Sequence, residues 1–461
     1  MKEKTKNKMA ETDVKKLMLF MSIPMIISMV LQALYNIVDS AFVSNMPEIG
    51  ESALNALTIA FPMQMLMIAV SIGTGVGVNA LTAKSLGQAN GEKASKVAGN
   101  GIFLALMIYI VFLMFGIFGV QFYVRTQTAN EMICEMSVKY LRICCINSAG
   151  IIFFSIFEKL LQATGNSLYS TIAQISGAVV NIIFDPIMIY GMLKFPKLGI
   201  NGAAIATVLG QYVSLIVALI FHIKKNKSVS IKLINIKPTY QIIKEIYAIG
   251  LPAIIAQALM SVMTYCINII CNRIGENMVT AYGLFYKIQQ FVLFAAFGIR
   301  DAITPIVSFS YGMKNKSRVK DGIKYGLIYI SVIMIIGTLI AEFFATSIAS
   351  MFGLTGQTEQ LCVSAMRIIS ISFFFAGVCI SFQGVFQAIG GGKQSLIISL
   401  CRQFIFVIPV VYILTELVLK FNLGQWIVWT AFLISEIITS IIATILLKTS
   451  AKRLFVQKKS S

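Results

Sequence analysis

The chain has few charged residues, and acids are its scarcest charges. Only 12% of its 461 residues are charged and 57% are hydrophobic, with a mean hydropathy of +0.82. Soluble domains carry about 25% charged residues, so a soluble enzyme is excluded. A helix that crosses a bilayer needs about 20 apolar residues, and runs of that length fill the chain. The composition therefore predicts an all-α integral membrane protein.

Residues that build metal centres and catalytic triads are nearly absent. His222 is the one histidine, and the eight cysteines lie mostly in apolar runs with no C-x-x-C spacing. A histidine-based metal site and a Ser-His-Asp triad are excluded. The cysteines are interpreted as small buried hydrophobic residues.

Sequence elements for ATP hydrolysis are also missing. The nearest match to a P-loop, AIGGGKQ at 388–394, lacks the first glycine and has glutamine where serine or threonine binds magnesium. The glycine-rich run 73–77 lies within an apolar segment, which favours close helix packing over nucleotide binding. We expect no enzyme and no bound cofactor. If the protein moves a solute across the membrane, an ion gradient must supply the energy, or the transport is passive.

Twelve apolar runs are predicted to span the membrane. They lie near 17–44, 56–84, 97–122, 131–158, 170–193, 200–222, 246–270, 281–311, 323–346, 361–388, 396–419 and 425–447. If the N-terminus is cytoplasmic, most of the 38 lysines and arginines fall on the inner side, and the outer side has only five: Arg125, Lys194, Lys197, Arg273 and Lys420. This asymmetry predicts cytoplasmic termini in a multi-pass protein of the cell membrane, and it explains the net charge of +19 without nucleic acid. We expect the chain to contact membrane lipids. We also expect it to be a monomer.

The second half of the sequence repeats the first at an offset near 225. QATG at 162–165 matches QAIG at 387–390, and Pro24 matches Pro252. The expected organisation is a tail at 1–16, an N-lobe at 17–222, a linker at 223–245, a C-lobe at 246–447 and a tail at 448–461. Two parallel six-helix repeats joined by a flexible basic loop suit alternating access around a central cavity.

Acids inside apolar helices are costly and usually mark a transport pathway. Asp39, Asp185 and Glu436 lie well inside, and the first two lie at similar depth, about 8 and 12 Å from the outer end at 1.5 Å per residue. Asn181 precedes Asp185 by one turn, and Thr207 lies in the next helix. These oxygen ligands suit Na⁺ or a proton relay. The alternative is that each acid pairs with a buried base or caps a kinked helix.

Further candidates extend this cluster. Tyr35 and Asn36 share the helix face of Asp39, and Gln64 recurs in the repeat as Gln289. Tyr35, Asn36 and Gln64 are candidates to line the cavity. Pro24 and Pro186 are expected to kink their helices. The repeat places Ile267, Phe406 and Val410 at the positions of Asp39, Asn181 and Asp185, so the ion site is expected only in the first half.

The remaining acids in or near the apolar runs can also be explained by pairing with a base or by a place near a helix end. Glu436 either faces the cavity and attracts a cationic substrate or pairs with Arg402. Five more acids sit nearer helix ends, where snorkelling or pairing is expected: Glu135, Glu158, Asp301, Glu342 and Glu416.

Four segments together resemble the multidrug and toxic compound extrusion (MATE) transporters. They are LYNIVDSAFVS at 34–44, QATG at 162–165, NIIFDPIMIYG at 181–191 and GINGAAIAT at 199–207. The resemblance covers nearly the whole chain and implies a V-shaped pair of six-helix lobes that exports cationic amphiphiles in exchange for H⁺ or Na⁺. Residue by residue, it implies a cation site, which holds a metal ion only if the coupling ion is Na⁺, at Asp39, Asn181, Asp185 and Thr207. It also implies that Pro24 is the helix hinge.

One departure narrows the resemblance. Segments 246–270 and 361–388 contain no acid, whereas NorM-like members carry acids in the C-lobe. The chain is therefore closer to the DinF-like branch. The leading hypothesis is a multidrug antiporter with a role in antibiotic resistance, and the alternative is a flippase for a lipid-linked precursor, which would need a strongly basic cavity. An enzyme or a scaffold has no supporting residues in the sequence.

Overall fold

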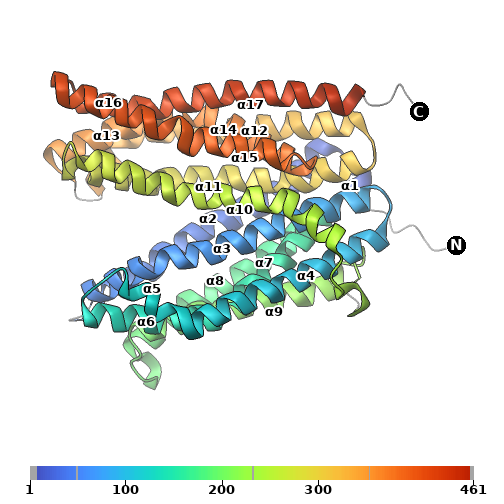
Figure 1. The fold of residues 1–461 in the computed structure, drawn as a ribbon, viewed down its shortest axis with the longest axis horizontal. Coiled ribbons are helices and arrows are strands. Elements are labelled where there is room, and N and C mark those ends of the chain that lie inside the picture. The colour runs from blue at the N-terminus through green and yellow to red at the C-terminus, as the bar shows by residue number, and fades with distance from the viewer. Residues whose placement is uncertain (1–7, 48–49, 231–232, 352–353, 457–461) are drawn as a thin grey trace. The chain divides into compact units, whose positions relative to one another are not determined.

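The computed structural model describes residues 8–47, 50–230, 233–351 and 354–456, and these ranges are almost wholly helical without a strand. Figure 1 shows long helices running alongside one another within each half of the chain. The apolar composition explains this choice, because a helix satisfies every backbone hydrogen bond within its own segment where no water is available. The predicted all-α fold is confirmed.

The first half of the chain begins with a short helix and continues through long ones. Its elements are α1 (Lys8–Glu11), α2 (Val14–Ser44), α3 (Gly50–Gly87), α4 (Gly91–Met114), η1 (Phe115–Gly119), α5 (Val120–Arg125), α6 (Glu131–Ile146), α7 (Ala149–Ala163), α8 (Ser167–Tyr190), η2 (Met192–Lys194), α9 (Ile200–Lys225) and η3 (Leu233–Ile236). Two of the short segments differ in type, because η1 is a π-helix and η2 a 3₁₀ turn.

The second half has the same sequence of long helices. Its elements are α10 (Tyr240–Asn272), α11 (Glu276–Gly312), α12 (Lys316–Met351), α13 (Gly356–Ser370), α14 (Phe373–Ala388), α15 (Gly392–Leu400), η4 (Cys401–Ile405), α16 (Val407–Phe421), η5 (Gln425–Trp429) and α17 (Thr430–Val456). The segment η4 is a π-helix that joins α15 and α16 into one span.

Ten described helices are long and apolar enough to cross a membrane, and the number rises to twelve if two bent pairs count as one span each. The pairs are α6 with α7, bent by 44°, and α13 with α14, bent by 51°. At the first bend the Asn147 side chain donates to the carbonyl of Ile143 at 2.9 Å, and the helix ends there. The bends occupy matching places in the repeat, which the sequence pattern alone did not predict.

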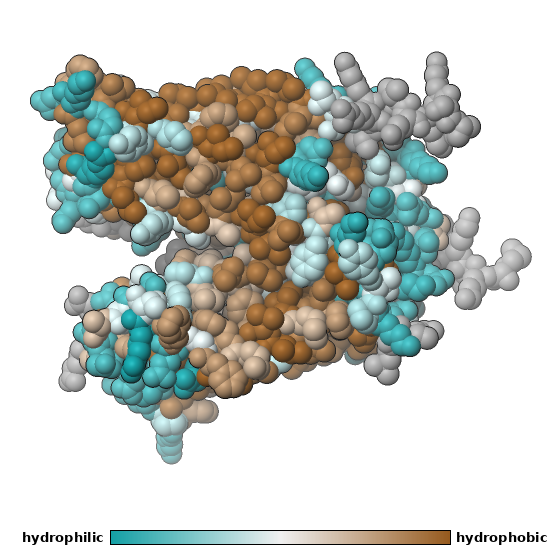
Figure 2. Space-filling view, viewed as in Figure 1, coloured by the Kyte–Doolittle hydropathy of each residue, from teal (hydrophilic) through white to brown (hydrophobic). Residues whose placement is uncertain are grey.

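The hydropathy of the surface follows the span pattern. In each half, brown apolar side chains cover the middle stretches of the helices and teal hydrophilic side chains gather near their ends (Figure 2). The exposed large hydrophobic residues include Phe118, Phe122, Phe343 and Ile223. In a membrane these side chains would contact lipid, so their exposure fits the predicted environment.

Packing divides the chain into two compact units. Unit 1 comprises 1–11 and 27–254, and unit 2 comprises 12–26 and 255–461. The boundaries fall inside α2 and α10 and so differ from the predicted lobe limits at 222 and 246. The first half of α2 belongs to unit 2 because it packs there: a Cβ on Gly298 of α11 would lie only 2.7 Å from the Ile26 nitrogen. The two halves of α2 therefore belong to different units.

The linker between the repeats is anchored where a flexible loop was expected. The Asn100 side chain of α4 accepts from the Thr239 amide at 2.8 Å and donates to the Lys237 carbonyl at 3.4 Å. A Cβ on Gly99 would lie 2.0 Å from the carbonyl oxygen of Asn235, so the linker backbone touches α4 directly. Backbone groups of Lys237 and Thr239 thus find partners on α4, so this part of the linker is held against the helix.

Candidate functional site

Helices α8 and α9 bring together three of the four residues predicted to bind the cation. The Asn181 amide nitrogen donates to Asp185 Oδ1 at 3.2 Å and to Thr207 Oγ1 at 3.5 Å. Asn181 and Asp185 face the same way because they are one helical turn apart. Asp185 is fully buried and Asn181 is 3% exposed, so the cluster lies inside unit 1.

The fourth residue, Asp39, lies in α2 within electrostatic range of Asp185. Three buried acceptor oxygens in this group have no hydrogen-bond donor among the described residues: Asp39 Oδ1, Asn181 Oδ1 and Asp185 Oδ2. Buried oxygens normally have partners, because an unmet acceptor costs about 1–3 kcal/mol. Their chemistry fits a proton or a small hard cation such as Na⁺. No group of three or more His, Cys, Asp or Glu suited to a metal occurs in the described part of the chain, so a Na⁺ site would use amide and hydroxyl oxygens too.

A close approach of two backbones holds α8 and α9 together beside this cluster. A Cβ on Gly177 would lie 2.3 Å from the Gly210 carbonyl oxygen, and a Cβ on Gly210 would lie 2.6 Å from the Gly177 carbonyl oxygen. Any larger residue would separate the helices. The two glycines therefore set the distance across which Asn181 reaches Thr207.

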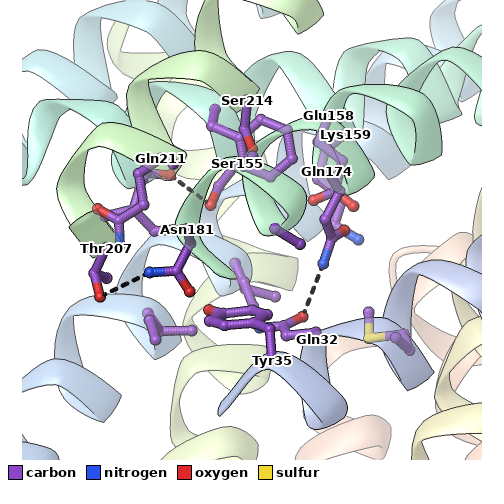
Figure 3. A pocket seen from close by; sticks show the side chains of 18 residues that line it. Gln32, Tyr35, Ser155, Glu158, Lys159, Gln174, Asn181, Thr207, Gln211 and Ser214 are labelled. Carbon is purple, nitrogen blue, oxygen red and sulfur yellow. Dashed lines mark hydrogen bonds between the residues drawn. The ribbon is translucent and has the colours of Figure 1, made fainter. Parts of the chain in front are cut away.

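A cavity in unit 1 opens next to the cluster. Figure 3 shows Asn181 and Thr207 at one end of it, the Tyr35 ring beside Asn181, and Gln32 with Gln174 at the other end. Tyr35 was predicted to line a cavity, and it lines this one. The side chain of Asn36 lies outside the described residues.

The other predicted residues lie apart from this cavity. Gln64 is not among its lining residues, and its amide donates to Tyr140 Oη at 3.3 Å and to Cys144 Sγ at 3.5 Å on α6. Pro24 lies within α2, in the part that packs in unit 2. Glu436 is also in unit 2, where Arg402 Nε donates to its Oε1 at 2.6 Å.

The MatE family model matches residues 24–187 and 252–413, which is most of the chain. The chain belongs to the MatE family. The two matches start at Pro24 and Pro252, the prolines that the internal repeat pairs. The protein is thus a multi-pass membrane transporter by family, and it is not an enzyme.

Similar proteins cover the MatE chain from end to end. The multidrug export protein MepA of Staphylococcus haemolyticus is 25% identical over 450 residues, which are 98% of this chain and 97% of the relative. A solved outward-facing structure of a multidrug resistance MATE family transporter of the MOP superfamily has a TM-score of 0.91 and 26% identity, with 98% and 99% of the two chains covered. A crystal structure of MATE in complex with MaL6 has a TM-score of 0.90 at the same identity and coverage.

The structure of this MatE protein adds a buried polar network that the sequence reasoning missed. Lys159 is 1% exposed, and its ammonium donates to Gln162 Oε1 at 3.0 Å, while the Gln162 amide donates to Glu158 Oε1 at 3.0 Å. Both charged residues line the cavity with Gln174, which donates to Gln32 Oε1 at 3.2 Å. Lys159 directly follows the apolar run predicted at 131–158, so a search for bases at the ends of these runs would have found it.

Most acids near helix ends are paired in the MatE structure. Asp301 accepts from Arg300 at 2.9 Å, Glu135 accepts from Lys139 at 2.5 Å, and Glu416 pairs with Arg273. For Glu158, expected to snorkel or to pair, the structure shows no snorkelling: it is 7% exposed, lines the cavity and accepts from Gln162.

Proposed function

We propose that this MatE protein is a secondary multidrug efflux transporter that exports cationic or amphiphilic organic compounds in exchange for H⁺ or Na⁺. The relatives named multidrug export proteins support the substrate class. The observation that carries the ion coupling is the set of three buried acceptor oxygens without donors, on Asp39, Asn181 and Asp185. An incoming cation would supply the missing positive charge.

Competition between cation and substrate would couple the inward movement of the ion to the export of the substrate. The cation site and the cavity of unit 1 share Asn181 and Thr207, so an ion at the site changes the wall of the cavity. If substrate binds only the ion-free form, ion binding releases it, and the coupling is reciprocal. The cation would act on the substrate through this shared wall.

Bending of α2 is proposed as the movement that follows ion binding. Pro24 cannot donate its backbone hydrogen bond, which weakens the helix at that point. Asp39 lies fifteen residues further along, about 22 Å at 1.5 Å per residue. A change at Asp39 would thus act on the outer part of a helix whose other part packs in unit 2.

The membrane arrangement completes the proposal. The chain would lie in the cell membrane with both termini cytoplasmic, because positive charge favours the inner side. The functional halves would be the six-helix lobes at 17–222 and 246–447, and the chain would act as a monomer by alternating access. The flippase alternative is not favoured, since Arg300 and Arg402 are neutralised by Asp301 and Glu436.

Drug efflux from proteoliposomes tests the proposal. Ethidium efflux is measured with an imposed proton or sodium gradient for wild type, Asp39→Asn and Glu135→Gln. The Glu135 side chain is 68% exposed and pairs within its own helix, so that variant is the matched control. We expect one gradient to drive efflux in wild type and control, and Asp39→Asn to abolish it. Efflux at the wild-type rate in Asp39→Asn would refute the coupling site, and no efflux in any protein would refute the transport function.

A further inference from the structure

A second cavity lies within unit 2, between α10, α11, η4, α16 and α17. Most of its wall is apolar and adaptable, formed by Met260, Met263, Leu293 and Phe432. Flexible methionines fit irregular apolar ligands. The rest of the wall is polar and includes Arg402, Gln403 and Glu436, which apolar packing does not explain.

The polar part of the cavity is a buried ion pair with one free carboxylate oxygen. Arg402 Nε donates to Glu436 Oε1 at 2.6 Å, and the two side chains are only 8% and 12% exposed. Glu436 Oε2 is buried and has no donor among the described residues. Removing charges from water is costly, so a buried pair with an unmet oxygen is not explained by stability.

Gln403 supplies a second unmet acceptor in the same cavity. Its side chain is 6% exposed, and its Oε1 has no donor in the described part of the chain. Gln403 and Arg402 are consecutive residues of the π-helix η4, yet both line the cavity. Short π-helical turns inside α-helices occur frequently at functional sites.

Aromatic rings line the same cavity as the unmet oxygens of Glu436 and Gln403. Tyr286 and Phe432 line the cavity. Phe432 stacks against Tyr282 with ring centroids 5.8 Å apart, and the Tyr286 ring is tilted against Tyr282 at 6.0 Å. Tyr282 also stacks on the buried Trp429 at 6.3 Å. Aromatic ring faces attract organic cations, most strongly where water is excluded.

We propose that this cavity is a binding site for the ammonium group of an organic cation. The ammonium would donate to Glu436 Oε2 and Gln403 Oε1, and the apolar part of the ligand would contact Met260 and Phe432. The site rests on the proposed function of organic-cation export, and it is separate from the cation site of unit 1. Arg402 would balance Glu436 when the cavity is empty, so the carboxylate is never left alone in an apolar environment.

The free groups select a cation over an anion. Both unmet atoms are acceptors, so a bound group must bring hydrogen-bond donors. An anion would place its negative charge against the Glu436 carboxylate and against the partial negative charge of the Gln403 amide oxygen. A charged donor to a carboxylate also forms a stronger hydrogen bond than a neutral donor does.

Two fluorescent probes that differ only in the ammonium test the site. Dansylcadaverine has a primary ammonium on a five-carbon chain, and N-pentyl dansylamide has the same body without it. Their affinities for the purified full-length protein are measured by fluorescence titration. We expect wild type to bind dansylcadaverine about tenfold more tightly, the effect of one good charged hydrogen bond.

Variants of the cavity residues test whether the preference for dansylcadaverine over N-pentyl dansylamide arises in this cavity. Gln403→Met removes one acceptor and keeps the ion pair, and the double variant Arg402→Met with Glu436→Met replaces the pair by apolar residues, which buried sites often tolerate. Glu416→Gln is the matched control, because Glu416 pairs with Arg273 outside the cavity. We expect the preference for dansylcadaverine to fall below about threefold in Gln403→Met, to vanish in the double variant and to persist in the control.

The outcomes separate this site from the proposed transport function. A wild-type preference in Gln403→Met would overturn the site even if the double variant fails to fold, because the ion pair is intact there. Ethidium efflux is measured in the same variants. Gradient-driven efflux together with an unchanged preference would leave the transport function standing and refute the site. A lost preference in a wild-type-like fold supports the site whatever the efflux result.

Discussion

Substitution of Gly210 by alanine should disturb the candidate cation site through backbone packing alone. The new Cβ would lie 2.6 Å from the Gly177 carbonyl oxygen and 3.1 Å from Asn181 Cβ. Carbon contacts relax near 3.5 Å, so α8 and α9 must separate by about 1 Å. The contact of Asn181 Nδ2 with Thr207 Oγ1, now 3.5 Å, would then exceed hydrogen-bond range.

The expected magnitudes follow from this displacement. Overpacking of this kind costs about 1–3 kcal/mol, so the thermal midpoint in detergent should fall. Loss of one hydrogen bond at the site, worth about 1.4 kcal/mol, should reduce gradient-driven efflux about tenfold at limiting ion concentration. Thermal unfolding and proteoliposome efflux are measured on the same preparation.

A second glycine provides the matched control. Gly283 lies within α11, and a Cβ there meets nothing within 4 Å. Gly283→Ala should keep wild-type efflux and unfold at the same temperature or higher, because alanine favours helix by about 1 kcal/mol. Wild-type stability and wild-type efflux in Gly210→Ala would refute the reasoning, since the site would then not depend on the close approach of α8 and α9.

Three further predictions concern other contacts of unit 1. A saturating coupling cation should raise the thermal midpoint of wild type, because it binds only the folded state, and Asn181→Leu should abolish that rise. Lys159→Met should destabilise the fold by about 1.5–3 kcal/mol in thermal or denaturant unfolding, because it removes a buried charged donor from the network of Glu158. Asn100→Ala should speed trypsin cleavage of the linker, because Thr239 and Lys237 lose their hydrogen bonds to α4.

Each of these variants has a control of the same residue type. Asn45→Leu alters an exposed amide at the end of α2 and should keep the cation-dependent rise. Lys139→Met breaks an exposed pair and should cost about 0–1 kcal/mol. Asn235→Ala breaks only a bond to Ser230 within the linker. Equal behaviour of a variant and its control would contradict the corresponding prediction.

Residue type and spacing alone predicted the main cluster of the candidate site. Asp39 and Asp185 stand out because charged residues are rare within apolar runs, and Asn181 follows from the helical period. The sequence could not show that Asn181 bonds Asp185 and Thr207 together. Nor could it show that Gln64 bonds to α6, because the period fixes the residues that share a face and leaves the rotation of each helix open.

The sequence by itself determined the helical membrane fold and the repeat, because each depends only on local composition and order along the chain. The tertiary structure decided which polar residues meet. It paired Arg402 with Glu436, buried Lys159 beside Glu158 and anchored the linker on α4. The ion pair and the linker contact join residues far apart in the sequence, and Lys159 is covered by α3, where a Cβ on Gly75 would lie 2.8 Å from Lys159 Cγ. These contacts are set by close packing, such as that of Gly177 against Gly210, which hydropathy does not encode.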